Sequence, residues 1–282
     1  MKIRIGKVLS FCRVGHRPNQ EDARFPDMDR PPSTQHFFVV CDGVGGTELG
    51  EVASTTVCQA IAKALGDIDF KKDFTNEEFL HMLDEAFDAL DRKSRQLDND
   101  DFATTLAFAA FHGEGSTLAH IGDSRIYQFR KNIGIIYESV DHSLVNQLVL
   151  KGLITADEAI DHPRNNVITR SMEPVEFDEN RSPATVYRTS DIQAGDCFLL
   201  CTDGVYGCLG EEELARLFSL SPDIEEAFNT LAAKCEESSD NNTAFLISIA
   251  EVENTDVNKD ASVITTSIST SLTEVQSESQ RR

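Results

Sequence analysis

Apolar residues recur along the chain in two spacings, and the shorter spacing predicts β-strands. Several short runs are rich in Val, Ile, Phe, Leu and Thr or alternate with polar residues, as strands do. We expect strands at residues 3–12, 36–41, 103–111, 116–121, 125–130, 133–138, 185–189, 196–201 and 243–250. Many of these runs follow one another at hairpin spacing, which favours antiparallel pairing.

Between the strands, apolar positions fall at the spacing of amphipathic helices. We expect helices at residues 48–65, 76–97, 211–219 and 223–236. The first ends before Gly66, and the second begins after Thr75 with Glu78 three positions on, which is a capping-box pattern. For the fourth, Ser221 is the expected N-cap and Pro222 the first helical residue.

Two segments differ from this alternating pattern. Residues 141–175 contain two short helical stretches, 144–151 and 156–160, the second with Thr155 and Glu158 as a capping box, and this segment is expected to be a mobile insertion. From 254 to 282 the chain contains Ser and Thr but no Phe, Tyr, Gly or Pro, which predicts disorder, although "SVITTSISTSL" could form an edge strand. We therefore expect one domain over residues 1–252 and a Ser/Thr-rich tail over 253–282.

Charge and composition narrow the function classes. The 282 residues carry a formal net charge of −22, which repels nucleic-acid phosphates and anionic lipid, so we expect no nucleic acid or membrane partner. The chain contains no 18-residue apolar run and no signal-peptide pattern at "MKIRIGKVLSFC". Its seven cysteines include no CxxC pair, which favours reduced thiols over a disulfide framework. These features predict a cytoplasmic protein, with a monomer as the default.

Acidic residues stand where apolar segments end, beside glycine or other turn residues. They are Glu21 and Asp22 in "RPNQEDA", Asp42 in "VVCDGVGG", Asp123 in "AHIGDSR", Asp203 in "LLCTDGV" and Asp240 in "SSDNNTAFLIS". If these carboxylates converge, they need a cation, because like charges cannot share a buried site uncompensated. Oxygen ligands of this kind select Mg²⁺ or Mn²⁺ over zinc.

Such a site favours phosphate-ester hydrolysis. Two ions about 3.5–4 Å apart would activate a water for attack at phosphorus. Arg17, four residues before Glu21, could clamp the phosphate oxygens. Taken singly, each residue has a simpler interpretation, because Asp-Gly is a common turn and Arg17 could be an ordinary surface arginine. The hypothesis depends on the whole set.

The order of these motifs resembles one family. The segments "GHRPNQEDA", "VVCDGVGGTELGEVAS", "FATTLAF", "AHIGDSRIYQFR", "VDHSLV", "HPRNNVITRSM", "GDCFLLCTDGVYG" and "DNNTAFLIS" are similar to those of the metal-dependent protein serine/threonine phosphatases of the PP2C (PPM) family, in their compact bacterial form. The resemblance covers residues 6 to about 252. It implies an α/β fold of four αββα layers, in which two antiparallel β-sheets pack together with helices on both outer faces.

The resemblance also implies roles for individual residues. Asp42 would bridge two Mn²⁺ or Mg²⁺ ions, and Gly43 would offer its carbonyl. Asp203 and Asp240 would complete the coordination shell of the first ion, and Glu21 and Asp22 would support the second. Asp123 with Asp203 would hold a third ion where one binds, and Arg17 would bind the substrate phosphate. Residues 141–175 would form a flap beside the active site. Phosphorylated proteins would be the substrates, and a Ser/Thr kinase with its targets would be the partners.

Four positions concern two further points: which group donates a proton to the leaving group, which the motifs leave open, and the shape of the flap. Val44 and Thr47 stand where many family members have histidine. Metal-bound water or His142 could then donate the proton to the leaving group. Glu173 stands where a glycine commonly follows the "TRSM"-like segment. Two alternatives to a general phosphoprotein phosphatase stay open: a catalytically silent binding module on the same fold, and a phosphatase dedicated to anti-sigma-factor antagonists.

Overall fold

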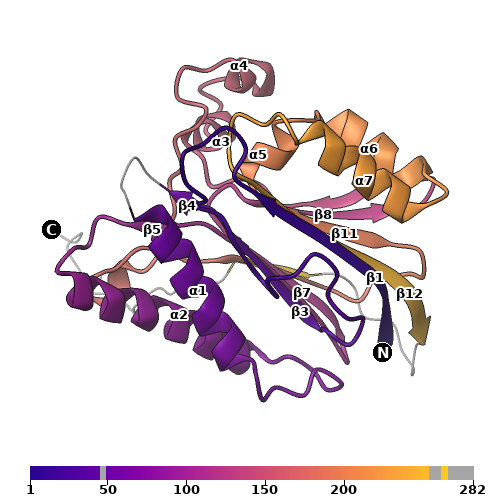
Figure 1. The fold of residues 1–282 in the computed structure, drawn as a ribbon, viewed down its shortest axis with the longest axis horizontal. Coiled ribbons are helices and arrows are strands. Elements are labelled where there is room, and N and C mark those ends of the chain that lie inside the picture. Colours follow the sequence, from indigo (N-terminus) through magenta and orange to yellow (C-terminus); the bar gives the residue numbers. More distant parts are fainter. Residues whose placement is uncertain (45–48, 254–261, 266–282) are drawn as a thin grey trace, which may run out of the picture.

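The computed structural model describes residues 1–44, 49–253 and 262–265, in which groups of strands are separated by groups of helices (Figure 1). The strands are β1 (Lys2–Arg13), β2 (Ala23–Phe25), β3 (Phe37–Cys41), β4 (Gly43–Val44), β5 (Ala103–Thr104), β6 (Leu106–His112), β7 (Gly115–Ile121), β8 (Arg125–Arg130), β9 (Gly134–Glu138), β10 (Thr185–Thr189), β11 (Cys197–Cys201), β12 (Asn242–Glu253) and β13 (Ser262–Thr265). The helices are α1 (Gly50–Ala64), α2 (Asn76–Leu97), α3 (Leu144–Leu150), α4 (Ala156–Ile160), α5 (Asp203–Tyr206), α6 (Glu211–Leu220) and α7 (Ile224–Lys234), with a 3-10 turn at Asp178–Asn180.

Two large antiparallel sheets form the centre of the molecule. One has five strands in the order β1-β12-β11-β8-β9, and the other has six in the order β13-β10-β7-β6-β3-β2. The short strands β4 and β5 pair with each other. The predicted antiparallel pairing is therefore confirmed.

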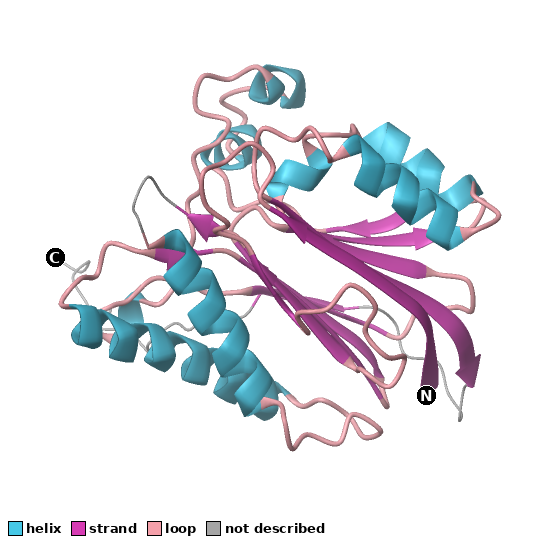
Figure 2. Cartoon of the chain, in the orientation of Figure 1, coloured by secondary structure: helices cyan, strands magenta, loops and turns pink. Residues whose placement is uncertain are grey.

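The continuous apolar run of β3 reflects burial on both faces. Phe38 and Val40 point into the core between the two sheets, whereas Phe37, Val39 and Cys41 face the outer layer formed by α1 and α2. Strand β11 follows the same rule on the other sheet, whose outer face is covered by α6 and α7. Figures 1 and 2 show these helix pairs on opposite sides of the sheets. The predicted four-layer sandwich is confirmed.

The capping patterns were predicted with mixed success. Thr75 caps α2 with a complete capping box, and Thr155 does the same for α4. The prediction of Ser221 as the cap of the last helix is wrong, because α7 begins two residues later and the Asp223 side chain accepts the Glu225 backbone N–H. A carboxylate there also complements the positive end of the helix dipole.

The segment 141–175 protrudes from the sandwich with α3 and α4, at the top of Figure 1. Its base is fixed by isolated bridges between Ser143 and Ile168 and between Thr104 and Met172. At the other end of the chain, β13 pairs with β10, which agrees with the edge strand considered for this region. The disorder predicted for the tail concerns positions 254–261 and 266–282, which lie outside the described residues.

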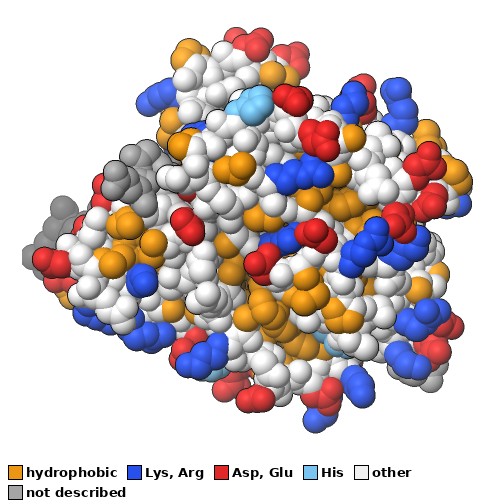
Figure 3. Space-filling view, in the orientation of Figure 1, with side chains coloured by type: hydrophobic (Ala, Val, Ile, Leu, Met, Phe, Trp, Pro, Cys, Tyr) orange, Lys and Arg blue, Asp and Glu red, His pale blue; other side chains and the backbone are white. Residues whose placement is uncertain are grey.

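The charge of the surface and the length of the helices are relevant to the expectation that the chain has no nucleic acid or membrane partner. On the face shown in Figure 3, acidic side chains are interspersed with basic ones, so this face shows no single block of one charge. Within the described ranges, every helix is too short or too polar to cross a bilayer. All seven cysteines are free thiols.

Candidate metal centre

The candidate site forms where strands of the two facing sheets end. Asp42 follows β3 of the six-stranded sheet, and Asp203 begins α5 just after β11 of the five-stranded sheet. Burial raises the pKa of Asp42 well above its usual range, and the neighbouring carboxyls of Asp22, Asp203 and Asp123 raise it further. The structure thus brings together acids that are far apart in the sequence.

Asp22 is the most completely enclosed acid of the Glu21–Asp22 pair. Its side chain is buried, and Oδ2 accepts a hydrogen bond from the Thr202 hydroxyl at 3.0 Å. The other oxygen, Oδ1, is buried without a well-formed hydrogen bond, although the Thr243 hydroxyl lies near the Asp22 carboxyl. Burial raises the pKa of Asp22 to about 8. A buried carboxylate oxygen without a partner is unusual and needs an explanation.

Two threonines hold the backbone of Asp42 in place. The Asp42 N–H donates to Thr105 Oγ1 at 3.0 Å, and the Asp42 carbonyl accepts from the Thr105 N–H and from Thr104 Oγ1, both at 2.8 Å. These bonds also explain why the strand predicted at 103–111 is divided into β5 and β6, because the backbone N–H of Thr105 bonds to Asp42 and not to a neighbouring strand.

Asp123 lies beside the same framework. Its neighbour Ser124 is buried, and the Ser124 and Thr105 hydroxyls are hydrogen-bonded at 2.6 Å. Burial raises the pKa of Asp123 to about 7, and the carboxyl of Asp203 contributes to this increase. Asp123 therefore lies within electrostatic reach of Asp203 from the other sheet.

Asp240 and Arg17 form an ion pair at the edge of the cluster. Arg17 Nη2 donates to Asp240 Oδ2 at 2.6 Å, and Asp240 Oδ1 accepts the Asn241 N–H at 2.9 Å. This hydrogen bond to Asp240 raises the pKa of Arg17, whose side chain is 54% exposed. In this structure the guanidinium therefore binds a candidate metal ligand and is half open to solvent.

Asn241 is a positioning residue that sequence reasoning missed. Its Oδ1 accepts the Glu21 N–H at 2.8 Å, and its Nδ2 donates to the carbonyls of Val14 and Asn19 at 2.8 and 2.9 Å. One buried amide thus fixes the loop that carries Arg17 and Glu21.

Two glycines allow oxygen atoms to gather between the loop and α1. A Cβ on Gly43 would lie 2.5 Å from the Gly50 carbonyl oxygen, so only glycine fits at position 43. A Cβ on Gly50 would lie 3.1 Å from the Gly43 carbonyl oxygen and 3.2 Å from Glu21 Oε2. The carbonyl and the carboxylate therefore border the same small space, which a side chain at position 50 would crowd.

These features fit a hard divalent cation. The donors are carboxylates and a backbone carbonyl, one buried carboxylate oxygen lacks a partner, and the gap at Gly50 is bordered by oxygens. In the part of the chain that the structure describes, no three His, Cys, Asp or Glu side chains form a ready-made coordination group. Mg²⁺ requires few protein ligands because it keeps several waters, and Arg17 occupies Asp240 here.

The structure argues against His142 as the proton donor. Its Nδ1 accepts the Gly122 N–H at 3.1 Å, and its Nε2 is 2.8 Å from Thr185 Oγ1. Burial lowers the pKa of His142 to about 3, and the neighbouring His120 and Arg170 contribute. A histidine that is neutral and hydrogen-bonded on both sides fits a structural role.

The structure describes two of the other three residues that differ from the family pattern. Val44 belongs to β4 and pairs with Ala103, and Glu173 is exposed near the end of the segment 141–175. Thr47 lies outside the described residues.

Comparison with known proteins identifies the family. The family model described as protein phosphatase 2C matches residues 13–244. Protein phosphatase PhpP of Streptococcus pneumoniae serotype 2 (strain D39) is 31% identical over 246 residues, covering 83% of this chain and 94% of PhpP. The chain therefore belongs to the protein phosphatase 2C family, and the predicted enzyme class, a protein phosphatase, is confirmed.

Solved structures agree with this assignment. The serine/threonine phosphatase Stp1 from Staphylococcus aureus superposes with a TM-score of 0.73 at 27% identity, covering 89% of this chain and 98% of that one. The catalytic domain of the serine/threonine protein phosphatase PstP, in complex with two manganese ions, gives a TM-score of 0.69 at 25% identity, covering 89% of this chain and all of that domain.

Proposed function

We propose that this protein hydrolyses phosphoserine and phosphothreonine in proteins, with two Mn²⁺ or Mg²⁺ ions at the cluster around Asp42. The observation that carries the proposal is the convergence of Asp22, Asp42 and Asp203, whose burial raises the pKa of each carboxyl. Burying several carboxylates together is unfavourable unless a cation compensates them. The names of PhpP, Stp1 and PstP, and the two manganese ions bound to PstP, support the same reaction and cofactor.

Residues of both sheets would hold the ions. Asp42 and Asp203 would hold the ions from the two sheets, with Asp240 on one side and Glu21, Asp22 and the Gly43 carbonyl on the other. When bound, the ions would supply an activated water and neutralise charge on the phosphate. The hydrogen bonds from Thr104 and Thr105 to the Asp42 backbone, and those of the Asn241 amide, would keep these oxygens in position.

Arg17 would bind the substrate phosphate. Its present partner, Asp240 Oδ2, is also a candidate metal ligand, so Arg17 would have to leave this ion pair when Asp240 serves as a ligand. A guanidinium can then form bidentate hydrogen bonds with phosphate oxygens. An open cleft is lined by Asp203 and Asp240 together with Cys208 and Lys234, and it offers room for the substrate chain.

Several finer features belong to the same proposal. A third ion would bind between Asp123 and Asp203, since the charge of Asp203 already raises the pKa of Asp123. Residues 1–252 would act as one monomeric, cytoplasmic phosphatase domain that opposes a Ser/Thr kinase, with 141–175 as the flap. The flap proposal is supported by the projection of α3 and α4 from the sandwich (Figure 1).

The test is phosphate release from a phosphothreonine peptide, with and without Mn²⁺. We expect turnover that requires the metal, stops in excess EDTA and disappears in Asp203→Asn, while Asp67→Asn, an exposed aspartate outside the cluster, retains it. Turnover that is unchanged in EDTA would refute the metal mechanism. A protein that binds Mn²⁺ without any turnover would support the silent binding module.

A further inference from the structure

Arg125 contacts two other parts of the molecule that meet beside the candidate metal centre. It is the first residue of β8 and follows Asp123 by two positions. Across the sheet it pairs with Cys201 of β11, which precedes Asp203 by two positions. Its side chain is mostly buried, with 23% exposed. A guanidinium in such a place needs partners within the protein.

The first contact of Arg125 is with the residue that begins the segment 141–175. Nε donates to Asp141 Oδ1 at 2.8 Å and Nη2 donates to Asp141 Oδ2 at 2.7 Å, so the pair is bidentate. The backbone carbonyl of Asp141 accepts Asn146 Nδ2, from α3, at 3.0 Å. Arg125 is therefore connected to the base of the segment that projects at the top of Figure 1.

The second contact of Arg125 is with α5. The guanidinium lies over the Tyr206 ring, 3.9 Å from its centroid, which is a cation–π contact. Tyr206 ends α5 and Asp203 begins it, so the ring and the candidate ligand belong to about one helical turn. Burial raises the pKa of the Tyr206 hydroxyl, and the carboxyls of Asp123 and Asp203 contribute. The ring that Arg125 covers is thus close to the acids of the candidate site.

The guanidinium of Arg125 is used entirely within the protein. Its remaining nitrogen, Nη1, donates to the Tyr127 hydroxyl at 3.1 Å and lies 3.5 Å from Glu138 Oε1. Each of the three nitrogens therefore has a protein partner, in contrast to those of the half-exposed Arg17. These contacts fit a residue that positions other groups and not one that binds the substrate phosphate.

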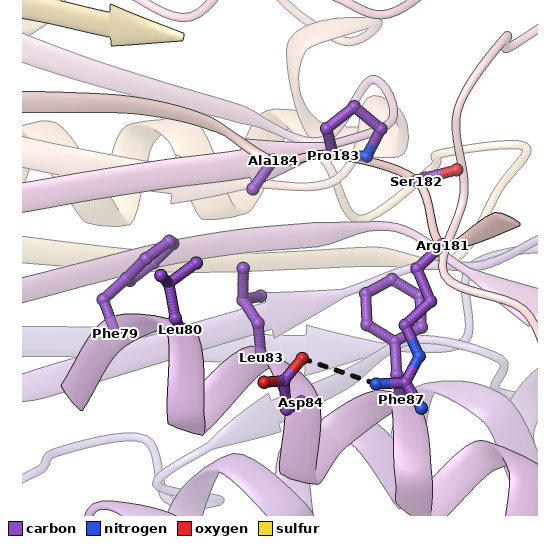
Figure 4. A pocket seen from close by; sticks show the side chains of 9 residues that line it. All are labelled: Phe79, Leu80, Leu83, Asp84, Phe87, Arg181, Ser182, Pro183 and Ala184. Atoms are coloured by element: carbon purple, nitrogen blue, oxygen red, sulfur yellow. Dashed lines mark hydrogen bonds and ion pairs between the residues drawn. The ribbon is translucent and has the colours of Figure 1, made fainter. Parts of the chain in front are cut away.

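Two further arginines, Arg130 and Arg181, are also paired with carboxylates, but they join other elements. Arg130, at the other end of β8, pairs with Asp191 and Asp196. Arg181 pairs with Asp84 of α2, and Figure 4 shows its side chain turned toward that helix. Arg130 lies in the same strand as Arg125 and is also mostly buried, so it provides a matched control for the loss of an arginine ion pair.

We propose that Arg125 is a positioning residue that couples the segment 141–175 to the metal centre. Its bidentate pair with Asp141 holds the base of that segment, and its contact with Tyr206 holds α5 and, through it, Asp203. A planar guanidinium can do both, because it offers a fork to a carboxylate and a face to an aromatic ring. The proposal rests on the proposed function, since Asp203 must serve as a metal ligand and 141–175 as the flap.

The first experiment compares Arg125→Lys with Arg130→Lys. Lysine keeps the charge but has neither the fork nor the flat face. Calorimetric titration should show Mn²⁺ affinity about tenfold lower in Arg125→Lys and unchanged in Arg130→Lys, because disturbed supporting groups typically cost a metal site about 10–100-fold. Hydrogen exchange of the metal-free proteins should be faster at 141–146 in Arg125→Lys only. Equal Mn²⁺ affinity or equal exchange at 141–146 in the two variants would overturn the coupling.

A second pair of variants tests the contact with α5 alone. Tyr206→Phe keeps the ring beneath the guanidinium and should bind Mn²⁺ as the wild type does. Tyr206→Leu removes the ring and should lower the affinity about tenfold. If these two variants bind Mn²⁺ equally well, the cation–π contact does not position Asp203.

Steady-state kinetics test the flap side of the coupling. At saturating Mn²⁺, we compare kcat/KM for a phosphothreonine peptide with kcat/KM for p-nitrophenyl phosphate, a small ester that offers the flap little to contact. The ratio of the two should fall about tenfold or more in Arg125→Lys and stay constant in Arg130→Lys. A constant ratio in both would contradict a role in positioning the flap. A wild type that hydrolyses neither substrate would refute the proposed function, while Mn²⁺ affinity and hydrogen exchange would still decide the role of Arg125.

Discussion

The small space at Gly50 gives the sharpest test of the metal centre, because filling it should harm metal binding more than folding. In Gly50→Ala the new Cβ would lie 3.1 Å from the Gly43 carbonyl oxygen and 3.2 Å from Glu21 Oε2. Both distances are a few tenths of an ångström shorter than an ordinary contact, so these oxygens must move. They are the two oxygens that we propose as support for the second ion.

The expected effect on stability is small. Gly50 is the first residue of α1, and alanine is favoured over glycine in helices by up to about 1 kcal/mol. This gain offsets the crowding, so the metal-free variant should unfold within about 1 kcal/mol of wild type. Metal sites tolerate ligand shifts of only about 0.2 Å, and disturbed supporting groups typically cost about 10–100-fold in affinity. We therefore expect Mn²⁺ affinity to fall at least about tenfold.

The assay combines calorimetric titration of Mn²⁺ with urea unfolding of the metal-free protein. Gly66→Ala is the matched control, because a Cβ there meets its nearest atom at 3.5 Å, an ordinary contact just beyond the end of α1. Phosphatase activity should fall in Gly50→Ala and recover in part at high Mn²⁺. If Gly50→Ala binds Mn²⁺ as tightly as Gly66→Ala does, the two oxygens do not take part in the site.

Three further predictions concern residues around the site. Asn241→Ala should lower the free energy of unfolding by about 2–4 kcal/mol, since it leaves three backbone groups without their partner, and a loss below 1 kcal/mol in urea unfolding would contradict this role. Arg17→Ala should raise KM for a phosphopeptide more than it lowers kcat. Steady-state kinetics, with Arg30→Ala as the control, can show this, and a pure kcat loss would contradict phosphate binding. Because the pKa of His142 is lowered to about 3, the unfolded chain binds more protons than the folded one below pH 6.5, and stability is lost as pH falls. Unfolding free energies should show about 2 kcal/mol of this loss between pH 7.5 and pH 5 in wild type, absent in His142→Gln, and parallel pH profiles would refute it.

Much of the fold could be predicted because its strands have an unambiguous pattern. Strands β3 and β11 are apolar throughout, since one face enters the core between the sheets and the other is covered by helices. The shortest strands were harder to predict: β2 and β4 were missed, and β5 was expected only as the start of one strand over 103–111. These strands contain only two or three residues, and their pairing depends on contacts distant in sequence. The misplaced Ser221 cap had a local cause, because Asp223 offered a better acceptor two residues on.

For the site, the acidic residues could be predicted from the sequence, but the residues that support them could not. The acids could be proposed because each lies near an end of an apolar segment, and the structure brings them within electrostatic reach of one another. Their supports could not be proposed, because Asn241 bonds to Glu21 across 220 positions and Thr105 bonds to Asp42 across 63. No periodic pattern reports such contacts.

The position of the carboxylates between two sheets links metal binding to the packing of the whole domain. Asp42 is fixed to β3 and Asp203 to β11, and the apolar residues Phe38, Phe245 and Ile247 hold the two sheets together beneath them. Without a cation, repulsion and burial of these acids oppose the approach of the strand ends, and the raised pKa values express that cost. A bound ion removes the repulsion, so it should stabilise the folded chain by an amount that grows with the logarithm of its concentration over its Kd. The same core that holds the proposed ligands rigid should therefore make the stability of the domain depend on the metal.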